Sequence, residues 1–248
     1  RLALDLPYNQ DALIRRLAAI NPNLVVGNIS GNAVAMPWIN EVPAIVQGWF
    51  LGSEAGNALA NVLTGKVNPS GKLPFSFPVK LSDNAAHALG AYPGENGNVE
   101  YKEGLLVGYR WHDAKNIKPL FPFGHGLSYT HFSYSKLRMS AKEMKKGESL
   151  TCTITLTNNG DRDGSEVVQL YLSDKKSALP RPPKELKGFQ KVELKAGESR
   201  EVSFVINEDL LQYYNDREQA WAAEPGRFEV LVGASSQEIK AKAVFDLK

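Results

Sequence analysis

The spacing of hydrophobic residues changes near residue 132, and this change constrains the fold more than any other feature of the sequence. Before it, apolar residues recur at helical spacing in some segments and form short continuous runs in others. After it, apolar and polar residues alternate one by one, which is the period of a strand with one buried face. A chain with both patterns predicts an α/β domain followed by an all-β domain.

Residues 9–29 predict a helix followed by a strand. Asn9 is expected to cap a helix over residues 10–20, and Asp11 suits its first turn because acidic groups complement the helix dipole. Asn23–Ile29, NLVVGNI, is a short apolar run typical of a buried strand in a parallel sheet. The apolar face of the helix would hold Leu13, Ile14, Leu17 and Ala18.

Residues 44–65 again predict one strand and one helix, here with the strand first. A strand is expected over 44–50, AIVQGWF, and Ser53 would cap a helix that runs to Leu63 and stops at Gly65. The strand and helix order implies right-handed crossovers and a mostly parallel sheet covered by helices. The second helix would turn Ala55, Ala58, Leu59 and Val62 inward.

The part after residue 132 is predicted to be a β-sandwich. About seven short strands with no long helix are typical of an immunoglobulin or fibronectin type III sandwich. The threonines between the apolar residues of 150–157 would form a row of hydroxyls in water. The alternating apolar sets are Leu150/Cys152/Ile154/Leu156, Val202/Phe204/Ile206, Phe228/Val230/Val232 and Ala241/Ala243/Phe245/Leu247, with turns at Asn159-Gly160, Ala196-Gly197 and Glu224-Pro225-Gly226.

These patterns predict a three-part organisation. An α/β domain is placed at 1–83, a long connecting segment that lies on both domains at 84–132, and the sandwich at 133–248. Within the connecting segment, a further strand is expected over Leu105–Trp111.

Composition and charge argue against several classes of function. Lys and Arg number 29 against 27 Asp and Glu, so no basic face is indicated and nucleic acid is not an expected partner. The apolar runs are too short to cross a bilayer, and no membrane insertion is expected. One cysteine, Cys152, and four scattered histidines give no zinc spacing, so we expect no metal and no cofactor.

Two glycine-rich segments could be mistaken for phosphate sites. Gly65–Lys72 differs from a P-loop because it has one residue too many between the glycines, a helix before it, and Leu73 in place of the magnesium-binding hydroxyl. Gly124-His125-Gly126 lacks the flanking strand and helix of a dinucleotide site and is interpreted as a tight turn. The nucleophile motif G-x-S-x-G does not occur, so a serine hydrolase is not indicated.

Three residues are candidates for lining a substrate crevice. Asn32 lies in the turn after the first expected strand, and Ser53 and Glu54 follow the second, where the carboxyl ends of parallel strands meet ligands. Purely structural roles remain open as alternatives: Asn32 could serve only to form the turn, and Ser53 and Glu54 could serve only to start the helix. Trp38, Trp49 and Trp111 could stack on a sugar or belong to the core.

Several segments, taken in order, carry a family resemblance. In the first part they are GWFLGSEAGNALANVLTGKV, NPSGKLPFSFP, VGYRWHD and PLFPFGHGLSYTHF, and in the second VVQLYLSD, RPPKELKGFQKVELKAGES and AEPGRFEVLVGASS. Together they resemble glycoside hydrolase family 3, the β-glucosidase and β-xylosidase family, over essentially the whole chain. In that family the segment like Asn68–Pro78 is a turn that leads into a strand, and the alternation of Leu73, Phe75 and Phe77 favours the same reading.

The resemblance implies the C-terminal portion of a retaining β-glycosidase. In the family a barrel-domain aspartate attacks the anomeric carbon and a glutamate protonates the leaving oxygen. Both are expected upstream of Arg1, so no catalytic residue is assigned here and activity would require the N-terminal barrel domain. The resemblance implies β-linked gluco-oligosaccharides or aryl glycosides as substrates, and a periplasmic or extracellular location.

Two other readings remain open. The chain could be a non-catalytic carbohydrate-binding or docking module, in which the sandwich and exposed aromatic residues hold glycan. Alternatively, the sandwich could be a spacer that holds the domains of an enzyme together. Binding of oligosaccharide by the isolated chain, without release of an aryl glycoside's chromophore, would favour the first of these two.

Overall fold

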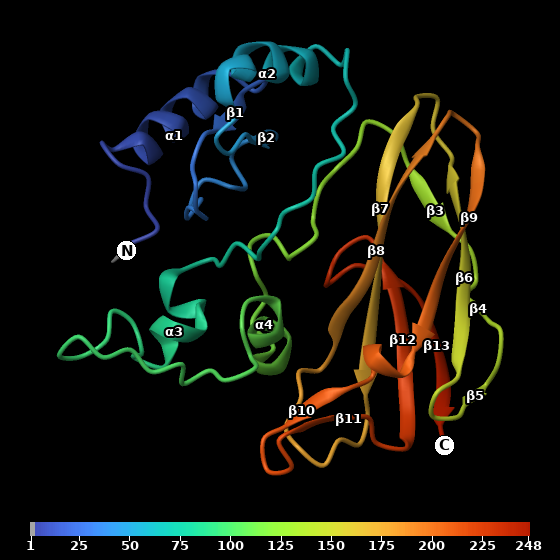
Figure 1. Cartoon of the computed structure of the whole chain (residues 1–248). Coiled ribbons are helices and arrows are strands. Elements are labelled where there is room, and N and C mark those ends of the chain that lie inside the picture. Colours follow the sequence, from blue (N-terminus) through green and yellow to red (C-terminus); the bar gives the residue numbers. More distant parts are fainter. Residues whose placement is uncertain (1–2) are drawn as a thin grey trace.

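The structure, a computed structural model, describes residues 3–248 and shows two unlike bodies (Figure 1). The first contains α1 (Gln10–Ile20), β1 (Val25–Asn28), β2 (Ala44–Gln47) and α2 (Ala55–Leu63), and we call it the α/β body. The second is a β-sandwich that begins at β3 (Phe132–Tyr134) and ends at β13 (Ile239–Leu247). The chain between them carries α3 (Ala85–Ala88) and α4 (Tyr109–Lys115). Among the described residues, no helix is long and apolar enough to span a bilayer.

The α/β body has a parallel strand pair and a small core. β1 and β2 pair in parallel from Val25↔Ala44 to Asn28↔Gln47, so the two expected strands exist but are shorter than predicted. The structure does not confirm the predicted mostly parallel, helix-covered sheet. β1 and β2 form a sheet of two strands, and the other sheets of the described residues are largely antiparallel. The core residues are Ala33, Val34, Met36, Trp38, Val42 and Phe77, which come from loops rather than from the strands.

The helices of this body cover the core only in part. Ile14 and Ala18 pack against the core, but Leu13 and Leu17 of the same predicted face are exposed. The prediction of a buried first strand is also wrong for Val25, which is 44% exposed. In α2, Ala58 is exposed, and Ala55, Leu59 and Val62 are only partly buried.

Both predicted helix caps are wrong, because backbone turns start these helices instead. Asn9 adopts a left-handed conformation (φ 60°) without a side-chain cap, a conformation that asparagine tolerates. Ser53 lies inside a 3₁₀ turn, η1 (Gly52–Glu54), and Glu54 occupies the N-cap position of α2 without a capping bond. Gly65 has φ 72° just after the C-cap of α2, as expected of a glycine that ends a helix.

Two strand predictions for the chain between the bodies differ from the structure. The chain bends at Pro74 and Phe75, and although the Leu73 amide donates to the His125 carbonyl and Phe77 exchanges backbone hydrogen bonds with Phe121, only a single bridge, Phe77↔Phe121, forms rather than a strand. Pro74 explains part of this, since proline lacks the amide that a ladder needs. The strand expected over Leu105–Trp111 is wrong. Leu105 lies in a turn, and Gly108, at φ 60°, occupies the N-cap position of α4, which begins at Tyr109.

The sandwich has the predicted alternation and a continuous core. One sheet has the order β5-β13-β12-β7-β8, and in the other β6 pairs with β3, β4 and β9. All four apolar sets predicted from the sequence point inward, including Leu150, Ile154 and Phe228. The remaining strands are β4 (Arg138–Met139), β5 (Glu143–Met144), β6 (Ser149–Asn158), β7 (Gly164–Asp174), β8 (Glu185–Leu194), β9 (Ser199–Asn207), β10 (Tyr213–Asn215), β11 (Ala220–Ala222) and β12 (Gly226–Gly233); β10 and β11 form a separate hairpin, and the 3₁₀ turns are η2 (Leu81–Asp83) and η3 (Glu208–Leu210).

Candidate functional site

A cavity of about 540 Å³ lies where the α/β body meets α3 and α4. Its walls come from segments that are far apart in the sequence: the turn after β1, the segment around Phe75, and the residues from α3 to α4. The lining is mixed, with apolar groups such as Phe75 and Pro78 beside polar groups such as Ser76. A cavity of this size and composition is suited to a small molecule.

The structure brings one of the three predicted crevice residues to this cavity. Asn32 is exposed and lines it, held in a turn in which the Ser30 hydroxyl donates to the Asn32 carbonyl (2.8 Å). Ser53 and Glu54 are exposed at the start of α2 and are absent from the described lining. The Glu54 carboxylate accepts a hydrogen bond from the Asn57 amide (2.5 Å), as an acid near a helix start often does.

Sequence reasoning missed the most distinctive polar group of the cavity. Glu103 and Trp111 both line it, and among the described residues the Glu103 Oε2 and Trp111 Nε1 atoms are buried without a hydrogen-bond partner. Native proteins leave few buried polar atoms unpaired, because each one costs about 1–3 kcal/mol. The close spacing of Glu103, Trp111 and His112 in one segment is the signal that could have drawn attention to it.

The other two tryptophans weighed as sugar platforms are structural. Trp38 is fully buried, and its indole N–H donates to the Asp11 carboxylate (2.6 Å). Trp49 packs edge-on against Phe75, with ring centroids 5.3 Å apart, and against Phe77 at 5.9 Å. Trp111 is therefore the tryptophan of the three that lines the cavity, with 6% of its surface exposed.

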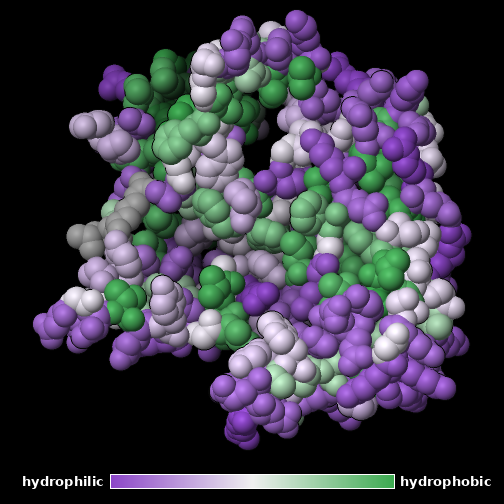
Figure 2. Space-filling model, viewed as in Figure 1, coloured by the Kyte–Doolittle hydropathy of each residue, from purple (hydrophilic) through white to green (hydrophobic). Residues whose placement is uncertain are grey.

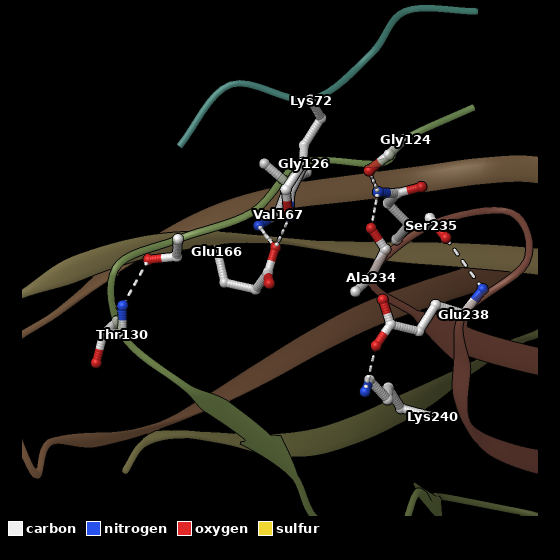
Figure 3. A network of polar contacts seen from close by, with 12 residues as sticks. Lys72, Gly124, Gly126, Thr130, Glu166, Val167, Ala234, Ser235, Glu238 and Lys240 are labelled. Carbon is white, nitrogen blue, oxygen red and sulfur yellow. Dashed lines mark hydrogen bonds and ion pairs between the residues drawn. The ribbon is translucent and has the colours of Figure 1, made fainter. Parts of the chain in front are cut away.

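A polar seam fixes the cavity-bearing part to the sandwich (Figure 3). The Lys72 ammonium forms an ion pair with Glu166 (2.7 Å) and donates to the Gly126 carbonyl (2.8 Å), so this lysine is engaged in structure, consistent with rejection of a P-loop. Gln169 donates to the carbonyls of Gly124 (3.2 Å) and Ala234 (2.7 Å). These contacts join the connection to β7 and to the loop after β12.

Glycines make this close approach possible. The predicted turn at Gly124 is present, since the His125 amide donates to the Pro122 carbonyl (3.1 Å) and Gly124 has φ 81°. A Cβ atom on Gly126 would lie 2.2 Å from the Gly71 carbonyl oxygen, so a larger residue could not fit without a backbone shift.

A second part of the seam holds α4, which carries Trp111. Asp113 pairs with Lys184 (2.5 Å) and accepts from the Gln237 amide (2.6 Å), and the Tyr109 hydroxyl accepts from the Leu186 amide (2.8 Å). Burial raises the pKa of Asp113 above its usual value, although Lys184 opposes that shift. The cavity wall is thus fastened to β8 and to the loop between β12 and β13.

The described residues do not provide a complete set of hydrolytic groups at this cavity. Glu103 is the one carboxylate among the described lining residues, and a retaining glycosidase uses two, about 5 Å apart. Cys152 lies in the sandwich core, where burial raises the pKa of its thiol to about 11, so it is not an activated nucleophile. Among residues 3–248, no group of three or more potential metal ligands is present.

Two family models match successive parts of the chain. Residues 1–129 match the "Glycosyl hydrolase family 3 C-terminal domain". Residues 166–236 match the "Fibronectin type III-like domain". The order agrees with an α/β body followed by a β-sandwich.

Known proteins align with the full length of the chain but extend far beyond it. The chain is 50% identical over 248 residues to beta-glucosidase BoGH3A of Bacteroides ovatus, covering 99% of this chain and 33% of that protein. It is 46% identical to thermostable beta-glucosidase B of Acetivibrio thermocellus over 242 residues, 98% of this chain and 32% of the relative. The chain thus spans about a third of these relatives.

Solved structures give the same result. The structure superposes on the beta-glucosidase from Kluyveromyces marxianus in complex with glucose with a TM-score of 0.94 at 39% identity, covering 100% of this chain and 29% of that one. The likeness therefore includes the fold of both bodies as well as the sequence. This chain belongs to glycoside hydrolase family 3 and carries its C-terminal domain followed by a fibronectin type III-like domain.

Proposed function

We propose that this chain is the C-terminal part of a retaining β-glucosidase, whose nucleophilic aspartate and acid/base glutamate lie outside the chain. The observation that carries the proposal is the alignment of 99% of the chain with a β-glucosidase of which it covers 33%. The proposed reaction is exo-acting hydrolysis of β-linked gluco-oligosaccharides or aryl glucosides. A double displacement with two carboxylates retains the anomeric configuration.

An exposed apolar face supports the proposal that an N-terminal barrel domain is the partner. Leu13, Ile20 and Phe50 are 57%, 76% and 81% exposed, and Figure 2 shows apolar side chains gathered at the α1 and α2 end of the molecule. Contiguous exposed apolar surface marks an interaction site in soluble proteins. We propose that other parts of the enzyme cover this face and extend β1 and β2 into a mostly parallel, helix-covered sheet.

The test compares the 248-residue chain with the longer parent enzyme. Each is incubated with 4-nitrophenyl β-D-glucoside, and the anomer first released is identified by NMR. We expect the parent to release β-glucose and the chain alone to give no turnover above buffer. Turnover by the chain alone at an ordinary enzymatic rate, or a parent inactive on every β-glucoside tried, would contradict the proposal.

The location of the parent enzyme is proposed to be periplasmic or extracellular, in keeping with enzymes that meet polymeric or oligomeric glycans. Cell fractionation with an antibody against the sandwich tests this directly. Recovery of the protein only with cytoplasmic markers would reject it.

A second candidate function, glycan binding without hydrolysis, is favoured by one observation. Tyr214 and Trp221 face each other across β10 and β11 with ring centroids 5.7 Å apart, and both are exposed. Exposed aromatic rings are suited to stacking on sugars. Affinity electrophoresis in soluble β-glucan tests this: Trp221→Ala should lose retardation, whereas Tyr101→Ala, at another exposed ring, should not.

A further inference from the structure

We propose that the cavity between Asn32 and α4 binds a neutral sugar of one or two rings through Glu103 and Trp111. The cavity volume of about 540 Å³ lies within the range of small-molecule sites. The inference goes beyond the proposed hydrolysis, because binding here requires no bond to be broken. It stands on the shape and polarity of the cavity in this chain.

The unpaired polar atoms of the cavity residues are the main observation. Trp111 Nε1 can only donate a hydrogen bond, whereas a carboxyl oxygen such as Glu103 Oε2 can accept one. Both atoms are buried without partners among the described residues, and both residues line the same cavity. Since such atoms destabilise a protein when left unpaired, a ligand that supplies one acceptor and one donor would relieve both as the side chains turn toward it.

The donor and acceptor together select the class of ligand. An ammonium ligand would pair with Glu103 but has no acceptor for the Trp111 N–H. A carboxylate or phosphate ligand would accept from Trp111 but brings no donor for the Glu103 oxygen. A hydroxyl group donates and accepts at once, so a neutral polyhydroxylated molecule satisfies both residues.

The remaining lining agrees with a sugar. Phe75, Pro78 and Trp111 offer apolar surface for the C–H faces of a pyranose ring. At the cavity, the exposed Asn32 carries a carboxamide, which provides both donors and an acceptor for further hydroxyls. His112 is held by its Nδ1 contact with the Ile117 carbonyl (3.0 Å) and keeps its ring at the wall.

NMR of the tryptophan side chains provides a site-specific test. The chain has four tryptophans, so ¹⁵N-labelled protein gives four indole N–H signals, which single Trp→Phe variants assign. On titration of the 248-residue chain with D-glucose, we expect the Trp111 signal to shift and saturate while the other three stay in place. No shift at saturating glucose, or a shift confined to Trp221, would overturn the inference.

Matched variants then test the two polar groups by calorimetric titration with D-glucose. Trp111→Phe keeps the ring but removes the donor and should weaken binding about tenfold, whereas Tyr101→Phe, which removes a polar atom from an exposed ring, should leave it unchanged. Glu103→Gln keeps a neutral acceptor and should weaken binding by less, about fivefold, with Glu218→Gln as the unchanged control. Tighter binding of methylammonium or acetate than of glucose would overturn the assignment of a neutral ligand.

The Asn32→Ala variant keeps the inference testable if a buried substitution disturbs the fold. Asn32 is exposed at the cavity, so its removal should leave the circular dichroism spectrum unchanged and weaken glucose binding several-fold. Unchanged affinity in this variant and in Trp111→Phe would reject the site. Hydrolysis by the parent enzyme is measured separately, so failure of the two proposals can be told apart.

Discussion

The α/β body and the sandwich differ in how they bury apolar residues, although the connection between them is held to the sandwich by the polar seam. Among the described residues, the sandwich core contains 21 buried side chains and the core of the α/β body contains six. Neither α1 nor α2 has a fully buried residue. Because burial of apolar surface is the main source of stability, the sandwich should hold itself together, whereas the α/β body should depend on contacts from outside it.

The largest expected effect comes from the sandwich core. Leu156 is fully buried, so Leu156→Ala should lower the free energy of unfolding by about 4 kcal/mol, through lost burial and the cavity left behind. Leu13→Ala, at a residue that is 57% exposed on α1, should change it by less than about 0.5 kcal/mol. Urea unfolding followed by far-UV circular dichroism gives both values. Equal losses in the two variants would break the comparison between the bodies.

The seam supplies the next effect. Lys72→Met leaves Glu166, whose side chain is 9% exposed, without its cationic partner. The free energy of unfolding should fall by about 3 kcal/mol, because a buried charge is left uncompensated. The Val167 amide still donates to the Glu166 carboxylate and limits the loss. The double variant Lys72→Met/Glu166→Gln removes the uncompensated charge and should recover most of the loss. Thermal unfolding of the single and double variants provides the measurement. A double variant as unstable as the single one would show that the charge is not the cause.

The same contrast explains which parts of the fold could be predicted from sequence. In the sandwich, the two-residue alternation around Ile154 and the turn glycine Gly197 (φ 75°) carry local information that determines strands and turns. In the α/β body and the connection, apolar runs such as Leu105–Trp111 have no such period. The outcome there depends on single residues, such as Gly108, and on tertiary contacts that override propensity.

The candidate site could be predicted only in part for a related reason. Asn32 was identified because a turn after a strand is readable from sequence, and its proposed role in ligand binding stays a prediction. The fold of the connection brings Glu103 and Trp111 to the same cavity. Glu103 is followed by the helix α4, where the sequence predicted a strand. Sequence spacing does not show which polar atoms of these side chains will lack partners.

A smaller effect concerns the pH dependence of the seam. Burial lowers the pKa of His125 below its ordinary 6.5, with a further contribution from Lys72 and an opposing one from Glu238. The folded state therefore favours the neutral ring. Its contribution to stability is present above pH 6.5 and is lost as the pH falls below that value, where the unfolded chain takes up the proton first.

His125→Gln tests this contribution. As the pH falls from neutral through 6.5, the native protein should lose more stability than the variant. Urea unfolding at several pH values gives the difference, and His131→Gln, at an exposed histidine in the connection, serves as the control. Parallel pH profiles for the native protein and His125→Gln would show that this ring does not titrate with folding.

The smallest expected effect lies on the outer face of the sandwich. The threonine hydroxyls of β6 were predicted to face water, and two of them also bond to β9 on this exposed face: Thr153 with Ser203 and Thr157 with Ser199, each at 2.8 Å. Thr153→Val keeps the β-branched shape and removes one such bond at an exposed position, where water can replace it, so stability should fall by about 0.5 kcal/mol or less. A loss above about 1.5 kcal/mol in urea unfolding would mean that this outer face, and not the core alone, stabilises the sandwich.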